Sequence, residues 1–232
     1  MYDYEEACPV SKAASVLCER WTLQIIREML LGASRFSELQ KYLPKLSPTL
    51  LNSRLRMLEQ QGLILKKKIP EKKGSEYQLT PSGQAILPIL QELGKWGMRY
   101  AFDSMNPDEL NISVLVRDFA VALNMDQLPG GDITVQFNVM SGDELARKFI
   151  MVRNRVAQVC DDNLGTEVDL YLTADLETYG RIWYGEITIV NAMQQGLLKV
   201  MGNNFLQNNL SKWLGTSQFA PFNQRCDLAG QA

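Results

Sequence analysis

Asn52 and Arg56 are the side chains whose types and spacing point most clearly to a chemical role. Both lie in a stretch that begins at Ser47-Pro48, where Ser caps free N–H groups and Pro suits the first helical position. Three leucines at helical spacing indicate its buried face: Leu51, Leu55 and Leu58. The opposite face then presents Thr49, Asn52, Ser53 and Arg56. Because Asn and Arg suit bidentate hydrogen bonds to adenine and guanine edges, this pattern predicts a helix that contacts bases in the major groove of DNA.

Basic side chains follow in a predicted hairpin, with strands at Leu63–Ile69 and Ser75–Thr80 and turn residues between them. Its lysines are Lys66, Lys67, Lys68, Lys72 and Lys73. Lysines suit phosphate groups, which provide affinity but little sequence information. The predicted DNA-contacting set consists of these lysines, the four helix residues and three more side chains: Arg35, Ser47 and Arg54.

Charge is unevenly distributed along the chain. Residues 1–100 carry 15 Lys and Arg against 10 Asp and Glu, a net charge of +5, whereas residues 101–232 carry 9 against 16, a net charge of −7. A basic region within one half is typical of a nucleic-acid-binding surface. The alternative is a helical domain whose polar helix and lysine-rich loop serve only solubility.

The composition argues against most enzymatic sites. The chain has no histidine, which removes histidine-dependent triads, histidine general bases and histidine-ligated metals. The four cysteines, at positions 8, 18, 160 and 226, show no CxxC spacing, and no glycine-rich nucleotide-binding motif is present. We therefore expect no enzymatic activity, no metal and no cofactor, and a hydrolase is the weakest alternative.

Helices dominate the prediction for the first half. Three stretches are predicted to be helical: Lys12–Leu31, as one segment or two joined around Glu19-Arg20, Arg35–Leu43, and Ser47–Gln61. The second and third form a helix-turn-helix. Another helix starts at Thr80-Pro81, and Pro88 predicts either a kink or a later true start. Its apolar face over Ile86–Tyr100 suits a dimer interface, packing within the protomer, or both.

The second half is predicted to be a separate α+β domain with an antiparallel sheet. Residues 103–107 resemble a linker, so we expect domains at 1–102 and 107–222. The expected helices span 112–123, 175–183, 188–195 and 204–214. The expected strands span 133–139, 147–160 (one long strand or two short ones), 168–173 and 197–201.

A dense set of residues in the first half matches one known family. They are Cys8-Pro9-Val10, Arg20-Trp21-Thr22, Arg27-Glu28, Gly32, Arg35-Phe36-Ser37-Glu38-Leu39, Pro44, Ser47-Pro48, Arg54-Leu55, Leu58-Glu59, Gly62-Leu63, Tyr77, Leu79-Thr80 and Gly83. Over about residues 5–102 the chain thus resembles the HxlR family of bacterial transcriptional regulators. The resemblance implies a winged helix-turn-helix, homodimerisation through the N-terminal and post-wing helices, and a palindromic DNA site. A dimer would supply the two half-site contacts.

Cys8 occupies a position with two interpretations. Some members of the HxlR family resemble redox or electrophile sensors that work through a cysteine near the N-terminus, which matches Cys8. Sensing requires a lowered thiol pKa, and the neighbouring Glu5 and Glu6 should disfavour the thiolate. Cys8 is therefore either redox-active or inert.

The second half contains VDLYLTADLETYGRIWYGE and then QQGLLKVMGN before the last predicted helix. This order of elements resembles the sterol carrier protein fold, which implies an apolar tunnel able to hold a lipid-like ligand. The candidate lining residues are Phe137, Ile150, Tyr171, Trp183, Ile189, Met193, Leu197 and Phe205. The alternative is that these side chains form an ordinary core.

These patterns predict a cytoplasmic, sequence-specific DNA-binding transcriptional regulator with double-stranded DNA as its partner. The two resemblances add a homodimer and a hydrophobic small molecule as a candidate effector. No uncharged apolar run reaches the roughly 18–20 residues that a membrane helix needs, and the acidic start does not resemble a signal peptide. The alternative function is a lipid or apolar-metabolite carrier whose first half serves only assembly.

Overall fold

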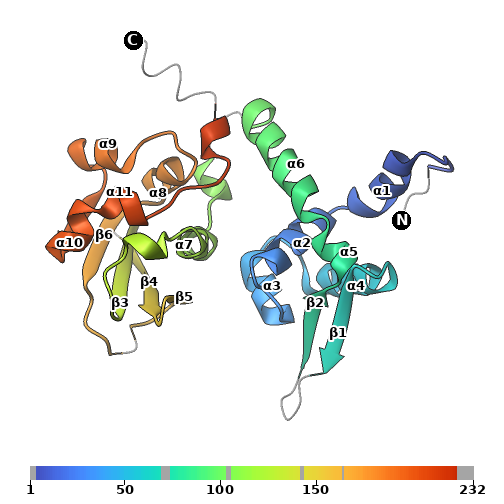
Figure 1. Ribbon diagram of the computed structural model, residues 1–232, viewed down its shortest axis with the longest axis horizontal. Coiled ribbons are helices and arrows are strands. Elements are labelled where there is room, and N and C mark those ends of the chain that lie inside the picture. Colours follow the sequence, from blue (N-terminus) through green and yellow to red (C-terminus); the bar gives the residue numbers. More distant parts are fainter. Residues whose placement is uncertain (1–3, 69–73, 103–105, 142–143, 164, 224–232) are drawn as a thin grey trace. The chain divides into compact units, whose positions relative to one another are not determined.

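The first unit of the chain, Met1–Leu93, consists of short helices and a two-stranded hairpin (Figure 1). The structure is a computed structural model that describes residues 4–68, 74–102, 106–141, 144–163 and 165–223. In chain order, the elements are α1 (Pro9–Leu17), α2 (Thr22–Leu30), α3 (Phe36–Tyr42), α4 (Pro48–Gln60), β1 (Ile64–Lys68), β2 (Ser75–Leu79), α5 (Pro81–Gln84) and α6 (Leu87–Tyr100), whose second half belongs to the next unit.

Capping side chains and prolines set the helix ends where the sequence predicted them. The Ser47 hydroxyl accepts a hydrogen bond from the Leu50 N–H at 3.3 Å, which caps α4, and Thr80 caps α5 in the same way. The region from Lys12 to Leu31 is two helices rather than one, and α6 begins beside Pro88. In both places the structure selects one of the two predicted alternatives.

The core of this unit lies between the helices and the hairpin. Leu51, Leu55 and Leu58 are buried on one face of α4, as their spacing predicted. They pack with the buried residues Ile25, Ile26, Leu39, Leu43, Leu46 and Ile64. In the hairpin, β1 pairs antiparallel with β2, and Ile64 lies opposite Leu79. The observed elements form a helix-turn-helix followed by a hairpin.

The second unit, Gly94–Ala232, combines helices with a five-stranded sheet (Figure 1). Its elements after α6 are α7 (Ile112–Val121), β3 (Ile133–Ser141), β4 (Glu144–Arg153), β5 (Val156–Cys160), β6 (Leu170–Asp175), α8 (Leu176–Trp183), α9 (Ile189–Gln194), β7 (Lys199–Gly202), α10 (Asn204–Asn208) and α11 (Leu210–Trp213), with 3-10 turns at Pro107–Glu109, Met125–Gln127 and Ala220–Phe222. The region 147–160 therefore contributes two strands.

The prediction of an antiparallel sheet is wrong in one respect, because β3 and β6 run parallel. The strand order is β5-β4-β3-β6-β7, and Val135 lies opposite Leu170 in the parallel pair. After β5, the chain crosses from one edge of the sheet to the other side of β3, where it forms β6. Because of this crossover, β6 runs in the same direction as β3. Alternation of apolar residues within a strand carries no information about such a return.

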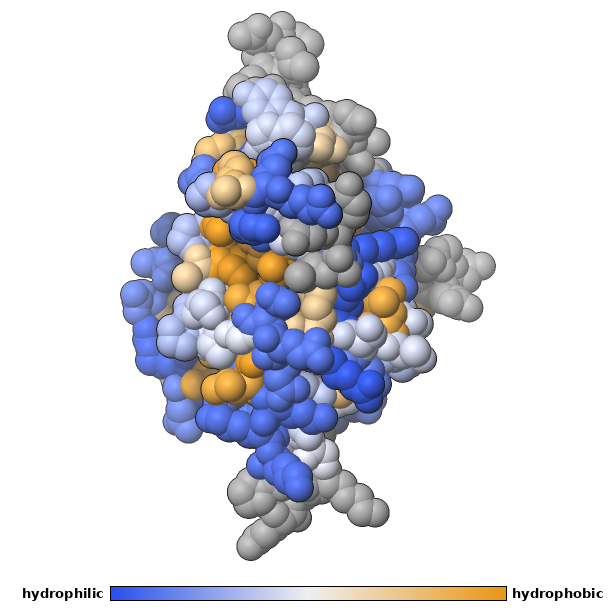
Figure 2. All heavy atoms as spheres, turned by 90° about the vertical axis from the view of Figure 1, so that its right-hand side faces the viewer, coloured by the Kyte–Doolittle hydropathy of each residue, from blue (hydrophilic) through white to orange (hydrophobic). Residues whose placement is uncertain are grey.

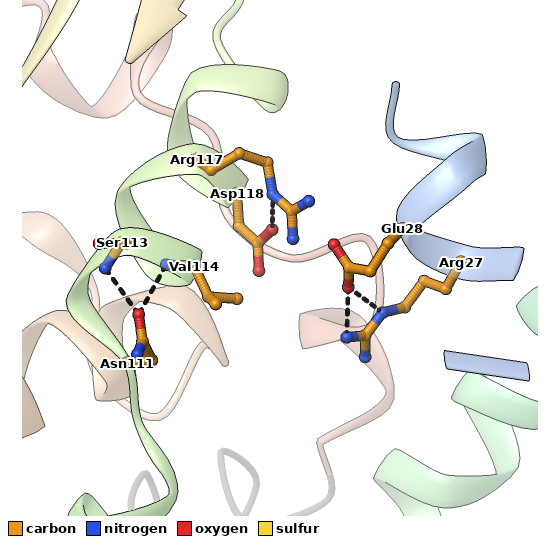
Figure 3. A network of polar contacts seen from close by, with 7 residues as sticks. All are labelled: Arg27, Glu28, Asn111, Ser113, Val114, Arg117 and Asp118. Carbon is orange, nitrogen blue, oxygen red and sulfur yellow. Dashed lines mark hydrogen bonds and ion pairs between the residues drawn. The ribbon is translucent and has the colours of Figure 1, made fainter. Parts of the chain in front are cut away.

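One face of the sheet carries the core of the second unit. Along β6, Leu170, Leu172 and Ala174 are buried while Tyr171 is exposed, as expected for a strand with one covered face. Helix α7 packs against β4 and β5, and α8 packs against β3 and β6. Asn111 begins α7 by accepting hydrogen bonds from the backbone N–H groups of Ser113 and Val114 (Figure 3).

Two boundaries differ from those expected. The compact units divide between Leu93 and Gly94, inside α6, while residues 103–105 of the expected linker at 103–107 lie outside the described residues. A Cβ at Gly94 would come within 2.3 Å of the Phe219 ring, so the last turns of α6 pack closely with the end of the second unit. The predicted final helix is two short helices, α10 and α11, separated at Asn209 by a non-helical backbone conformation.

Two general properties follow from the residues that the structure describes. None of the helices in that part of the chain is both long enough and apolar enough to cross a membrane. In the same part, no three Cys, Asp or Glu side chains gather in an arrangement suited to a metal ion.

Candidate nucleic-acid interface

The exposed face of α4 is the centre of the candidate site. Thr49, Asn52, Ser53 and Arg56 are all exposed, opposite the buried leucines. Together with Met57 and Gln60, these four side chains line an open hollow of about 560 Å³. A helix with short polar residues and one Arg on its free face can bring hydrogen-bond donors and acceptors to base edges without burying its own polar atoms.

The sequence interpretation missed Met57 and Gln60 as members of this surface. Gln60 follows Arg56 by four residues and therefore lies on the same side of the helix. That spacing was available in the sequence. Gln is a suitable partner for an adenine edge, as Asn is.

Helix α3 and the turn before α4 hold the start of α4 in place. The Glu38 carboxylate accepts hydrogen bonds from the backbone N–H groups of Ser34 and Arg35 at 2.8 and 3.0 Å. At the other end, the Gln40 side-chain amide donates to the Leu46 carbonyl at 2.7 Å. Arg35 itself is exposed. Glu38 thus caps the start of α3, and Gln40 ties α3 to the turn before α4.

The hairpin presents the predicted lysines of its first strand to solvent. Lys66, Lys67 and Lys68 are exposed on β1. The Lys67 ammonium donates to the Gln78 side-chain oxygen at 2.6 Å, and the Lys66 ammonium lies 5.8 Å from the centre of the Tyr77 ring. Both contacts come from the neighbouring strand β2 and orient the lysine side chains. Lys72 and Lys73 lie outside the described residues.

Arg54 differs from the exposed predicted contacts because its guanidinium is partly buried and interacts with two groups of a distant turn. Its Nε donates to the Arg20 carbonyl at 2.9 Å, and its Nη1 lies 3.0 Å from a carboxylate oxygen of Glu19. Its side chain is 19% exposed. Helical spacing places Arg54 beside the buried leucines, three residues after Leu51 and four before Leu58, but it does not reveal the partners of Arg54, which come from a distant part of the chain.

Cys8 is exposed and stands at the N-cap position of α1. Its thiol makes no capping hydrogen bond of ordinary geometry. The backbone N–H of Ser11, followed by that of Val10 and the Ser11 hydroxyl, nevertheless lowers the pKa of Cys8 below its usual range. Glu5 and Glu6 were expected to disfavour the thiolate, but neither is among the causes of the shift in the pKa of Cys8.

The candidate lining residues of the second unit fall into two groups. Phe137, Ile150 and Ile189 are buried in the core, and Trp183 and Leu197 are partly buried against it. Tyr171, Met193 and Phe205 are instead 37% to 51% exposed. The structure therefore brings the first group together around the sheet and leaves the second group at the surface.

Helix α6 carries an apolar stripe, a row of large apolar side chains that are exposed in the described residues. Ile89, Leu93, Trp96 and Tyr100 recur at helical spacing and are 49%, 47%, 57% and 62% exposed. Figure 2 shows the face of the molecule that is on the right in Figure 1, where apolar and hydrophilic residues alternate; it does not identify the stripe, because Trp and Tyr are not among the most hydrophobic residues on its colour scale. Large apolar side chains exposed in a row are typical of a surface that another molecule covers.

Comparison with known proteins gives matches to the first half of the chain. The model of the HxlR-like helix-turn-helix family matches residues 16–105. YvaP, an uncharacterized HTH-type transcriptional regulator of Bacillus subtilis (strain 168), is 41% identical over 97 residues, which cover 41% of this chain and 90% of that protein. An uncharacterized HTH-type transcriptional regulator of Methanothermobacter thermautotrophicus is 34% identical over 110 residues, covering 47% of this chain and 84% of that protein.

Among solved structures, the reduced form of the transcriptional regulator YodB from B. subtilis is 30% identical, and the match covers 43% of this chain and all of that one with a TM-score of 0.38. The two sequence relatives are covered almost completely, and both are named as transcriptional regulators. The chain belongs to the HxlR-like helix-turn-helix family of transcriptional regulators.

Proposed function

We propose that the protein is a homodimeric transcriptional regulator that reads a specific DNA sequence with α4 and holds the phosphate backbone with the lysines of β1 and with Lys72 and Lys73. The observation that carries this proposal is the free face of α4, where Thr49, Asn52, Ser53 and Arg56 are exposed opposite three buried leucines. Base contacts from such a face would supply specificity, and the lysines of the hairpin would supply affinity. We also propose a cytoplasmic location, since chromosomal DNA lies in the cytoplasm of bacterial cells.

The apolar stripe of α6 supports the homodimer. Ile89, Leu93, Trp96 and Tyr100 follow one side of the helix, so two copies of α6 could bury them against each other in a two-fold arrangement. A two-fold dimer would place two α4 helices on half-sites about one helical turn of DNA apart, roughly 34–36 Å. The expected DNA site is therefore a palindrome.

The second unit is proposed to bind an apolar effector in a domain that resembles the sterol carrier protein fold. The support is the order of elements from α7 to α11 and the aromatic cluster above the sheet, in which Phe119 lies 5.8 Å from Phe137 and 5.1 Å from Trp183 between ring centres. A ligand that prefers one arrangement of the dimer would change the affinity for DNA.

Selection of duplexes from a random-sequence pool by the full chain tests the proposal. We expect an enriched palindromic motif with two identical half-sites. Recovery of no motif after repeated rounds would contradict sequence-specific binding.

Native mass spectrometry of the same freshly purified protein tests the effector. We expect a mass that includes one bound apolar ligand per chain. The mass of a ligand-free dimer under gentle ionisation conditions would count against an apolar effector. A bound apolar ligand in this experiment, together with no motif from the duplex selection, would favour a carrier of apolar molecules instead of a regulator.

A further inference from the structure

Arg54 connects α4 to the turn between α1 and α2. Its guanidinium reaches two groups of that turn at once, the Arg20 carbonyl at 2.9 Å and the Glu19 carboxylate at 3.0 Å. The side chains of Arg54 and Glu19 are only 19% and 20% exposed. Its neighbours Ser53 and Arg56 on the same helix are exposed. The planar guanidinium, with several fixed donors, is the group best suited to hold a carbonyl and a carboxylate together.

The turn that Arg54 holds has an unusual backbone. Trp21 has φ +76° and ψ −7°, a left-handed conformation that few non-glycine residues adopt. Such a conformation persists only where surrounding contacts determine it. The Trp21 ring packs against the core of the first unit, and the Arg20 guanidinium lies 5.5 Å from its centre. Since the Arg20 carbonyl belongs to the peptide group that precedes Trp21, Arg54 fixes this strained peptide directly.

We propose that Arg54 is a positioning residue for DNA recognition: it fixes α4 to the α1–α2 turn through Glu19 and Arg20 and does not itself contact DNA. This inference rests on the proposed DNA-binding function. The turn joins α1, which ends at Leu17, to α2, which begins at Thr22. Because α4 is anchored there, the position of the turn contributes to the angle at which Asn52 and Arg56 meet the bases.

Four substitutions distinguish positioning from direct contact, and one of them, Arg54→Ala, removes the guanidinium and its charge altogether. Arg54→Lys keeps the positive charge and would serve a phosphate as a point charge, but it cannot hold both oxygens of the turn. Glu19→Ala removes a negative charge from the DNA-binding unit, so simple electrostatics predicts tighter DNA binding. Glu59→Ala is the matched control, because Glu59 is an exposed carboxylate near the end of the same helix.

The measurement is the affinity of the full chain and its variants for the selected duplex at several salt concentrations, with folding checked by circular dichroism. Positioning predicts that Arg54→Lys weakens binding about tenfold, that Glu19→Ala also weakens it, and that the double variant is no weaker than Arg54→Lys alone. For Arg54→Lys and Glu19→Ala, the slope of the logarithm of the DNA association constant against log[salt] should stay at the wild-type value, because both variants still bind the same phosphates. Glu59→Ala should bind as well as or better than the wild type.

Two results would overturn the proposal. One is near-wild-type binding by Arg54→Lys. The other is tighter binding by Glu19→Ala together with a shallower salt slope for Arg54→Ala, by about 0.9 for each phosphate that this variant no longer binds. Failure of the proposed function is a separate outcome, because the wild-type protein would then show no preference for any selected duplex.

Discussion

At the residue scale, Asn52 and Arg56 are expected to determine which bases are preferred. Arg56→Ala should remove one base contact, cost about 1–3 kcal/mol on the best site and relax preference at one position of each half-site. Asn52→Ala should act similarly at another position. Competition binding with single-base variants of the selected duplex measures both effects.

Lys66→Ala is the control for these variants, since Lys66 is exposed on the hairpin. It should weaken binding to every duplex by a similar factor and lower the salt slope by about 0.9 for each phosphate that Lys66 binds. A loss confined to one base position in the Lys66 variant would contradict the division between base-reading and phosphate-binding residues.

Cys8 should form its thiolate at lower pH in the native protein than in the unfolded chain. The N–H groups of Ser11 and Val10 stabilise the negative charge and lower the pKa. The alkylation rate as a function of pH, with Cys18, Cys160 and Cys226 replaced by Ser, should therefore have its midpoint below that measured in denaturant. Ser11→Ala should move the native midpoint upward, because the hydroxyl contributes to the shift. Equal midpoints in the native and denatured states would refute this assignment.

At the element scale, the buried face of α4 should dominate the stability of the first unit. Leu55 is 2% exposed, so Leu55→Ala should destabilise this unit by about 2–5 kcal/mol through reduced burial and the resulting cavity. Its neighbour Arg56 is exposed, and Arg56→Ala should change stability by no more than about 0.5 kcal/mol. Urea unfolding followed by circular dichroism compares the two. Equal midpoints for both variants would show that α4 is not packed as described.

The stripe on α6 should decide whether the protein is a dimer. Trp96 is 57% exposed, and Trp96→Glu would place a charge in the proposed apolar interface, where an unpaired charge is strongly unfavourable. We expect monomers in analytical ultracentrifugation at concentrations where the wild type is a dimer. Val121, which is 56% exposed on α7, provides the control, and Val121→Glu should leave the dimer intact. A Trp96→Glu dimer would exclude this stripe as the interface.

The elements differ in how far the sequence predicted them. The ends of α4 followed from Ser47, Pro48 and the spacing of three leucines, because capping and burial act locally. The parallel pairing of β3 with β6 depends on a crossover between distant segments, which no local pattern records. The break at Asn209 was also missed, since the apolar positions Leu206, Leu210 and Trp213 keep helical spacing across it.

At the scale of the whole molecule, the candidate site could be predicted because it lies within one contiguous and basic stretch. The exposed residues of α4 and the lysines of β1 are where the pattern placed them. The role of Arg54 could not be predicted, because its partners are 34 residues away or more and only the folded chain brings them together. The candidate lining residues of the second unit separated into buried and exposed groups for the same reason, since strand register and sheet order decide which side chains share a face.

One measurement tests the central claim most directly. It compares the affinity of the full chain for the DNA upstream of its own gene with its affinity for a random duplex of equal length, at several salt concentrations. A dimer with roughly 6–10 phosphate contacts should lose about 10³–10⁵ in affinity between 50 and 200 mM salt. Its preference for the upstream duplex should persist across that range, because base contacts provide it. No measurable affinity, or equal affinity for the two duplexes at every salt concentration, would contradict a regulator that reads DNA through α4.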